Sequence, residues 1–193
     1  MDIAEQIRAE LRESARVRES FSEELVRRIA EFADAAAKAI RADGKIVFFG
    51  NGGSAADAQH LAAELVVRLA RTRPGIRALS LGTNASVLTA AGNDLGFEQI
   101  FSRQIESLVS DKDVLVALST SGNSPNILRG AEAGRARRAF IVGMTGASGG
   151  ELAKKVDLLL NVPSQNAQRI QEAHITIGHI VCALIEQNCF PAK

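Results

Sequence analysis

The sequence predicts an α/β fold: a doubly wound, about five-stranded parallel sheet flanked by helices, with an N-terminal helical extension. Three observations lead to this prediction. Short apolar runs alternate with helical stretches from Lys45 onward, which is typical of parallel sheets. The runs are continuously apolar, as expected for strands buried on both faces. The length of 193 residues suits one domain with a short extension.

Two helices are predicted before the first strand. In the first, apolar residues recur every four positions among charged ones: Ile3, Ile7 and Leu11. In the second, the segment from Ser20 to Glu23 fits a capping box, and Gly44 ends the helix. Neither helix can bury its apolar stripe alone. We therefore divide the chain into N-terminal helices, residues 1–43, which pack on the later domain or on another subunit, and a domain of residues 44–193.

The predicted strands and helices alternate through the domain. The strands are Ile46–Phe49, Ile76–Leu81, Val114–Leu118, Phe140–Gly143 and Val156–Val162. The helices are Ala55–Ala70, Ala85–Ala91, Phe97–Val109, Pro125–Ala136 and Ala167–Gln187. In sheets of this kind, ligands bind at the carboxyl ends of strands, where the next helices begin.

The composition excludes several classes of function. A formal net charge of +1 gives no electrostatic case for a nucleic-acid partner. No apolar run reaches membrane-spanning length, and the charged N-terminus does not fit a secretory signal. The two cysteines, Cys182 and Cys189, form neither a metal-ligand spacing nor a disulfide framework, which indicates a reducing, cytoplasmic environment.

A glycine-rich loop, Gly50-Asn51-Gly52-Gly53-Ser54, follows the first predicted strand. Glycines let the backbone approach a ligand closely, and the start of the next helix offers unpaired N–H groups to an anion. One alternative is a dinucleotide fingerprint, but the second strand ends without the acidic residue that this fingerprint needs. The other alternative is a plain glycine turn with Ser54 as the helix cap.

A second loop follows the third predicted strand and carries four hydroxyl groups: Ser119, Thr120, Ser121 and Ser124. Pro125 suits the first position of the next helix and Ser124 suits its cap, but capping does not explain the other three. Hydroxyl and backbone N–H groups at a helix start suit a phosphate monoester, and the loop lacks the lysine of a nucleotide-binding P-loop. We therefore favour a phosphate site over plain capping.

Histidines and a carboxylate provide a second candidate site. His60 and Glu64 share one helix face and could ligate a metal ion or act as acid and base, although a surface hydrogen bond is the alternative. The last helix carries Gln171, His174 and His179. His174 and His179 lie about 140° apart around the axis, so they cannot both face one site. The sequence alone does not choose between them.

Four segments together resemble those of phosphoheptose isomerases: FFGNGGSAADAQHLAAEL, TAAGNDLGFEQIFSRQ, STSGNSPNIL and RIQEAHITIGHIVCALIE. These enzymes are sedoheptulose 7-phosphate isomerases of the sugar isomerase (SIS) domain superfamily, which has a flavodoxin-like fold. The resemblance extends from about Lys45 to Phe190. It implies an aldose–ketose isomerase that interconverts sedoheptulose 7-phosphate and D-glycero-D-manno-heptose 7-phosphate. The product feeds lipopolysaccharide core or other surface glycan synthesis. The resemblance also implies a cytoplasmic homotetramer with sites between subunits.

The resemblance implies roles for individual residues. Glu64 is the candidate base and His179 the candidate acid, and one zinc ion per subunit is expected on His60, Glu64, Gln171 and His179. This ligand set leaves His174 outside. The implied substrate-binding residues are Asn51, Gly52, Gly53, Ser54, Glu64, Arg68, Asn93, Asp94, Ser119, Thr120, Ser121, Ser124 and Gln171. Within this set, the hydroxyl residues from Ser119 to Ser124 are expected to bind the phosphate. At Gln168, some family members have an acidic residue instead.

Other functions are considered beside the isomerase. A non-catalytic SIS regulator, which binds a bacterial replication initiator, keeps both loops but lacks residues matching Glu64 and His179. This sequence has both residues, which favours the enzyme. A binding module that senses a sugar phosphate and an isomerase of a shorter phospho-sugar are the remaining alternatives.

Overall fold

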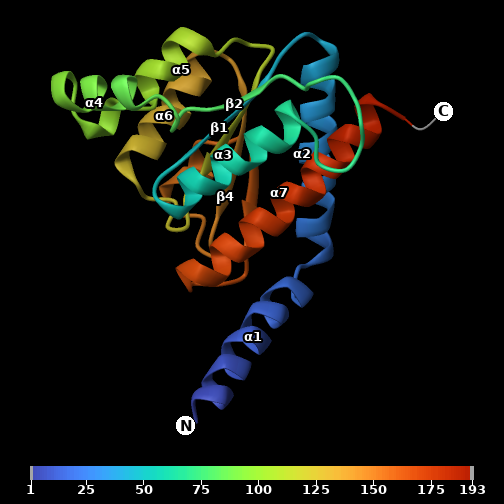
Figure 1. The fold of residues 1–193 in the computed structure, drawn as a ribbon. Helices are drawn as coiled ribbons and strands as arrows, with labels where there is room; N and C mark the ends of the chain where they lie inside the picture. Colours follow the sequence, from blue (N-terminus) through green and yellow to red (C-terminus); the bar gives the residue numbers. More distant parts are fainter. Residues whose placement is uncertain (1, 192–193) are drawn as a thin grey trace.

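The computed structural model describes residues 2–191. Five parallel strands form one sheet in the order β2-β1-β3-β4-β5, with helices on both faces (Figure 1). The strands are β1 (Ile46–Gly50), β2 (Ala78–Ser80), β3 (Val114–Leu118), β4 (Phe140–Thr145) and β5 (Leu158–Asn161). This is the flavodoxin-like strand order, and it confirms the predicted fold class.

Seven α-helices and two short 3-10 helices connect or precede these strands within the described part of the chain. They are α1 (Ile3–Glu19), α2 (Glu23–Arg41), α3 (Gly53–Val66), α4 (Ala85–Asp94), η1 (Phe97–Gln99), α5 (Ser102–Leu108), α6 (Pro125–Ala136), η2 (Glu151–Lys154) and α7 (Ala167–Cys189). Helices α2, α3 and α7 cover one face of the sheet, and α5 and α6 cover the other.

Most predicted boundaries agree with the structure to within three residues, and four differences have a local cause or change an element. The predicted cap at Ser20 is wrong, because the Ser22 hydroxyl accepts the capping hydrogen bond from Leu25 N and Ser20 instead follows the end of α1. Helix α3 ends at Val66 rather than near residue 70. The predicted helix 97–109 is divided into η1 and α5. Strand β2 pairs over only three residues, because it lies at the sheet edge and has one neighbour.

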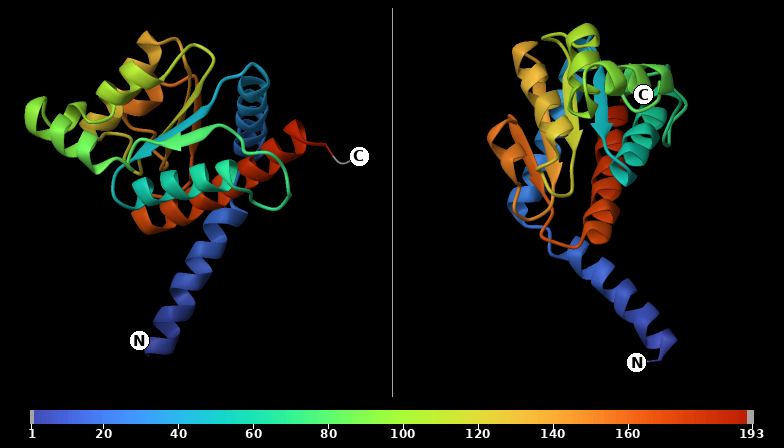
Figure 2. Two further views of the ribbon diagram at one scale, coloured as in Figure 1. Left: turned by 45° about the horizontal axis from the view of Figure 1, so that its top comes forward. Right: turned by 90° about the vertical axis from the view of Figure 1, so that its left-hand side faces the viewer.

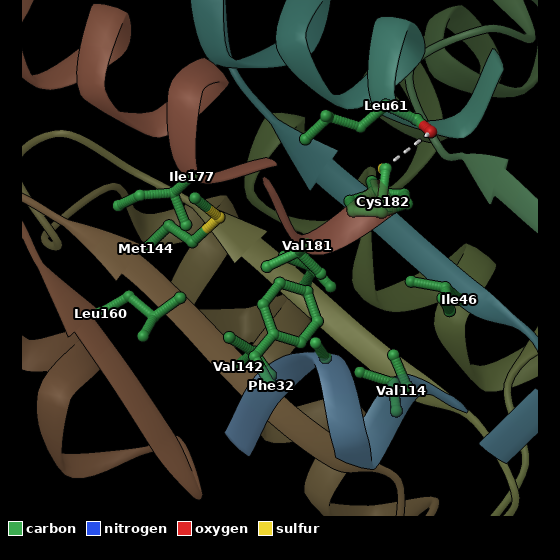
Figure 3. Packing of buried hydrophobic residues seen from close by; sticks show 14 of the residues in the cluster. Phe32, Ile46, Leu61, Val114, Val142, Met144, Leu160, Ile177, Val181 and Cys182 are labelled. Atoms are coloured by element: carbon green, nitrogen blue, oxygen red, sulfur yellow. Dashed lines mark hydrogen bonds between the residues drawn. The ribbon is translucent and has the colours of Figure 1, made fainter. Parts of the chain in front are cut away.

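The larger core lies between the sheet and helices α2, α3 and α7. Phe32 of α2, Leu61 of α3 and Ile177 of α7 meet there over the apolar side chains of the central strands (Figure 3). Each of these three side chains is almost fully buried. Residues two apart on the strands enter this layer, while those between them enter the core on the opposite face. The sheet is therefore a rigid platform for the loops at its carboxyl ends.

The two N-terminal helices differ in their packing. Helix α2 buries one face against β5 and α7. Helix α1 has no buried residue and projects from the body of the molecule (Figure 2). Its three periodic apolar residues are 73%, 56% and 65% exposed: Ile3, Ile7 and Leu11. Arg169 of α7 attaches α1 by donating a hydrogen bond of 2.7 Å to the Glu10 carbonyl. No helix within residues 2–191 has the length and hydropathy needed to cross a bilayer.

His174 is part of the core. Its Nε2 lies 3.2 Å from the carbonyl oxygen of Thr145, at the end of β4, and its ring is fully buried. This contact requires a proton on Nε2. Burial lowers the pKa of His174 to about 4, and the hydrogen bond to Thr145 opposes this effect only partly. The ring is therefore neutral at physiological pH and has a structural role.

We predict that His174 makes the protein less stable in acid. Its pKa rises from about 4 in the folded chain to the ordinary value of 6.5 in the unfolded chain, so the unfolded chain binds more protons between these values. The His174 contribution is complete above pH 6.5 and is lost as the pH falls through 4, by about 3 kcal/mol. The control is His174→Gln, which keeps an N–H donor but does not titrate. Urea unfolding at pH 7 and pH 4 should show a larger loss for the unsubstituted protein. Equal losses would contradict the prediction.

Candidate active site

Two loops meet at the carboxyl edge of the sheet. One follows β1 and leads into α3, and the other follows β3 and leads into α6. Strands β1 and β3 are neighbours at the point where the strand order reverses, which is where open α/β sheets bind ligands. The amide groups of Asn51 and Asn126 exchange two hydrogen bonds of 2.8 Å and so connect the loops. Asn126 is not among the residues predicted from the sequence.

The loop of residues 119–124 presents several donors. The hydroxyl of Ser124 makes no capping hydrogen bond to α6, although Pro125 occupies the first turn as predicted. Within residues 2–191, no group accepts from the backbone N–H of Thr120, Ser121 or Ser124. Free N–H and hydroxyl groups at a helix N-terminus form a suitable site for an anion. The loop therefore offers donors to a phosphate group, and this role stays a prediction.

A neighbouring segment fixes the shape of this loop. Gly146 N donates to Thr120 O at 3.0 Å, and Leu152 N donates to Gly122 O at 2.9 Å. Gly122 has a φ of +66°, and a Cβ there would overlap the carbonyl oxygen of Gly149. Only glycine satisfies both conditions. The loop is thus held in one conformation by the chain that follows β4.

A cluster of possible metal ligands lies between α3 and α7. The Nε2 atoms of His60 and His179 are 2.8 Å apart, and His60 Nε2 lies 3.3 Å from Glu64 Oε1. One ligand atom from each residue lies within 4.8 Å of the others. Periodicity alone left His174 and His179 as alternatives, and the structure brings His179 to His60 while it buries His174 against β4. The seam between the helices is half open to solvent, with the His60 side chain 48% exposed.

The donor set of this cluster fits a divalent transition metal. Two imidazoles and a carboxylate are ligands that zinc accepts in open, catalytic sites. Two nitrogen ligands of a tetrahedral zinc ion stand about 3.4 Å apart, so the two rings need to separate by only about half an ångström. The His60 side chain lies on an exposed face, so its ring is not packed on all sides. The residues present can therefore hold the ion that the resemblance implies.

Gln171 lies at the other end of the same helix seam. A Cβ on Gly53 would overlap the Gln171 amide, so this amide rests on the first turn of α3. This position is about two turns before His60. Ser54 is buried within that first turn, and Gly52 rather than Ser54 is the N-cap of α3, so the alternative of Ser54 as a cap is wrong.

Three predicted residues lie apart from these groups in the single chain. Asn93 and Asp94, at the end of α4, are exposed and hydrogen-bond to each other at 2.7 Å. Arg68 follows α3, is exposed and donates to Thr72 at 3.3 Å. Asp94 lines a hollow with Arg103. This hollow is different from the groove of about 590 Å³ beside the two loops, which is lined by Asn51, Gly96, Phe97, Glu98, Ser124, Pro125 and Asn126.

Asp57 is a further candidate that the sequence reasoning missed. It lies on α3 one turn before His60, and one of its carboxylate oxygens is buried without a hydrogen-bond partner in residues 2–191. Burial raises the pKa of Asp57 to about 6, and the nearby His60 opposes this effect. A carboxylate three positions before a predicted ligand was the available signal. Alone, it does not distinguish a site residue from a helix-surface charge.

Comparison with known proteins gives the class of the chain. A family model described as the SIS domain matches residues 11–146. The fold and the two loops at the sheet edge are therefore those of a SIS domain protein.

Individual relatives narrow this class. The phosphoheptose isomerase of Burkholderia pseudomallei is 49% identical over 168 residues, which cover 87% of this chain and 85% of that protein. The phosphoheptose isomerase of Geobacter sulfurreducens is 49% identical over 185 residues, 96% of this chain and 98% of that protein. The solved structure of the phosphoheptose isomerase from Neisseria gonorrhoeae matches with a TM-score of 0.91 and 40% identity. It covers 96% of this chain and 100% of that chain. The chain belongs to the phosphoheptose isomerase family.

We predict that Gly122→Ala disrupts the loop of residues 119–124 (the hydroxyl loop) more than a matched substitution disrupts the loop of residues 50–54 (the glycine loop). Gly52 also has a positive φ, +54°, but a Cβ there would meet no atom within 4 Å. Gly52→Ala should therefore cost only backbone strain, about 1–3 kcal/mol, whereas Gly122→Ala adds the overlap with Gly149. Urea unfolding should show the larger loss of stability for Gly122→Ala. Equal losses would indicate that the loop is not fixed by its neighbour.

Proposed function

We propose that the chain catalyses the aldose–ketose isomerisation of sedoheptulose 7-phosphate to D-glycero-D-manno-heptose 7-phosphate. The observation that carries this proposal is the His60–Glu64–His179 cluster in a chain that belongs to the phosphoheptose isomerase family. The reaction moves a carbonyl between C1 and C2. It requires a base for a proton on carbon and an acid for the oxygens. A carboxylate and an imidazole on facing helices supply these two groups.

The phosphate of the substrate binds the loop of residues 119–124 in this proposal. Thr120, Ser121 and Ser124 supply hydroxyl groups and backbone N–H groups, and Ser119, whose N–H donates to Met144 O, supplies its hydroxyl group. Asn51 and the glycines after it line the sugar. Asn93, Asp94 and Arg68 line the same pocket in the complete site. Anchoring the phosphate away from C1 and C2 converts its binding energy into orientation of the reacting end.

Glu64 acts as the base and His179 as the acid. The Glu64 side chain is 20% exposed, so it is shielded but still reachable by a substrate. His179 is half-buried and stands across the seam from Glu64, where its ring can deliver a proton to an oxygen of the enediolate. A zinc ion held by His60, Glu64 and His179 would supply Lewis-acid stabilisation of the negative charge on these oxygens. Gln171, the fourth ligand that the resemblance implies, lies against Gly53 and would have to turn toward the cluster to join it.

A complete site requires a second copy of the chain. Glu64 lies about 16 Å along the axis of α3 from Gly53, so the candidate base is far from the loops at the start of that helix. The separate positions of Asp94 and Arg68 also support a site shared between subunits. The exposed apolar side chains of α1 are suited to such assembly. We propose a homotetramer of this kind in the cytoplasm, making heptose for lipopolysaccharide core or another surface glycan.

A substrate panel tests the proposed activity. The purified protein should convert sedoheptulose 7-phosphate, read by product chromatography, faster than it converts shorter phospho-ketoses. Faster turnover of a shorter sugar phosphate would assign a different isomerase activity. Binding without any turnover would assign a sensor or a regulator of another protein.

We predict that Glu64→Gln binds the substrate and folds normally but loses turnover by about 10²–10⁴-fold, since the amide cannot accept the proton. Isomerisation rates and circular dichroism measure the two properties. The matched control is Glu106→Gln, at an exposed glutamate of α5 that pairs with Arg103, and it should be fully active. A Glu64→Gln variant with near-normal turnover would remove the base from the mechanism.

We also predict that a chelator lowers both the activity and the thermal stability, and that zinc restores both. A ligand present at 100 times its dissociation constant stabilises the folded chain by about 2.7 kcal/mol. The His179→Ala variant has lost one ligand and should respond little to the chelator. Full activity in protein shown to be metal-free by elemental analysis would exclude a role for zinc in turnover.

A further inference from the structure

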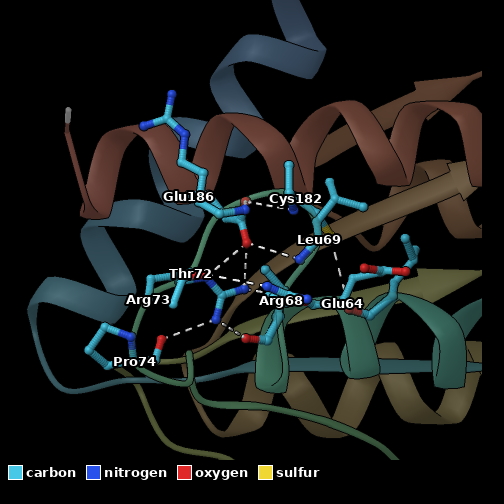
Figure 4. A network of polar contacts seen from close by, with 12 residues as sticks. Glu64, Arg68, Leu69, Thr72, Arg73, Pro74, Cys182 and Glu186 are labelled. Atoms are coloured by element: carbon cyan, nitrogen blue, oxygen red, sulfur yellow. Dashed lines mark hydrogen bonds and ion pairs between the residues drawn. The ribbon is translucent and has the colours of Figure 1, made fainter.

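A buried ion pair connects the end of α3 to α7. The Arg73 and Glu186 side chains are each only 1% exposed, with 2.9 Å between Arg73 Nη2 and Glu186 Oε1 (Figure 4). Arg73 Nε also donates to Glu186 Oε1 at 2.9 Å. Two guanidinium nitrogens thus contact the same carboxylate oxygen in a buried site, where charge-assisted hydrogen bonds are strong.

Each member of this pair also binds backbone groups. The Glu186 carboxylate accepts from three successive N–H groups, those of Leu69, Ala70 and Arg71. Burial alone would raise the pKa of Glu186, but these N–H groups and Arg73 outweigh it and hold the pKa below its ordinary value. Glu186 is therefore ionised. Its carboxylate holds the backbone of residues 69–71, which follow the end of α3.

Arg73 also contacts the backbone of Glu64, the proposed base. Its Nη2 donates to the carbonyl oxygen of Glu64 at 2.9 Å, and its Nη1 donates to that of Leu65 at 2.6 Å. These carbonyls belong to the last turn of α3, whose oxygens have no partners further along the helix. A guanidinium group at this end is also favoured by the helix dipole. Arg73 thereby fixes the backbone of Glu64 itself.

Glu186 lies on the helix that carries His179. Seven residues separate them, almost two full turns, so both project from nearly the same face of α7. The chain of contacts runs from the Glu64 backbone through Arg73 and Glu186 to the helix of His179. We propose that Arg73 and Glu186 are positioning residues that set the distance between Glu64 and His179, and so the affinity of the metal cluster. This inference rests on the metal site proposed above.

The geometry makes a specific alternative testable. A purely structural pair would stabilise the fold without changing the cluster, whereas a positioning pair changes zinc affinity in protein that remains folded. Residues that orient metal ligands from outside typically change affinity by about 10–100-fold. We expect Glu186→Gln and Arg73→Lys each to raise the zinc dissociation constant at least about tenfold, measured by competition with a chromogenic chelator. In both variants, kcat should fall more than KM rises.

A comparable buried acid serves as the control. Asp113 is 1% exposed and accepts from Lys45 N, Ser110 N and Lys45 Nζ, but it precedes β3 at the amino end of the sheet. Asp113→Asn should lower the thermal stability without changing zinc affinity. The comparison therefore separates lost stability from lost positioning.

Each outcome decides the matter. Unchanged zinc affinity in a folded Glu186→Gln or Arg73→Lys variant would overturn the positioning role and leave the isomerase function intact. Failure of both variants to fold would assign the pair to the fold alone and would also overturn it. If the unsubstituted protein itself binds no zinc at His60 and His179, the metal site proposed above fails instead.

Discussion

The parallel packing of α3 against α7 is the contact on which the proposed chemistry depends. The two helices run in the same direction over one face of the sheet, and every candidate metal ligand lies on one of them. Their close approach requires Gly178, because a Cβ there would overlap Leu61. At one end of the seam Gln171 lies against Gly53, and at the other Glu186 accepts from Leu69 N. The two helices are therefore held together at both ends, and His60, Glu64 and His179 lie between these two contacts.

The sheet connects this seam to the loop of residues 119–124. Strand β1 leads directly into α3 through the glycine loop, so the position of β1 determines where α3 begins. Strand β3 pairs with β1 along its whole length, and Asn51 and Asn126 join the loops that follow them. The hydroxyl loop is then fixed by the segment after β4. The pairing of β1, β3 and β4 thus fixes the positions of the two loops relative to each other.

Local chemistry in the sequence was sufficient for the elements that depend on it. Strand β3 and helix α6 have the predicted boundaries. Continuous apolar residues define β3 as a strand buried on both faces, and Pro125 fixes the start of α6. The end of α3 could not be predicted in this way. It is set by Arg73 and Glu186, which are 113 residues apart in the sequence, and no local pattern indicates such a pair. The error at Ser20 has a similar cause, since two nearby serines both suit a cap and only the path of the chain selects Ser22.

The choice between the histidines of α7 also needed the tertiary structure. Both lie on one amphipathic helix, but His174 faces the sheet and His179 faces the edge of α3. A fully buried imidazole remains neutral and inert, whereas one at a seam can bind a ligand or exchange a proton. Spacing along the helix gives the angle between the two rings but not which of them faces the core.

The exposure of the cluster in one chain is the remaining constraint on the chemistry. An enediolate is stabilised by fixed charges most strongly where water is excluded, yet His60 is 48% exposed. Val66 and Val67, at the end of α3, and Ile180, next to His179 in the sequence, are apolar residues that are 47%, 67% and 43% exposed. Apolar groups around a polar centre are typical of a surface that a partner covers. A second copy placed there would exclude water from Glu64 and His179, and this supports the proposal that the site is shared between subunits.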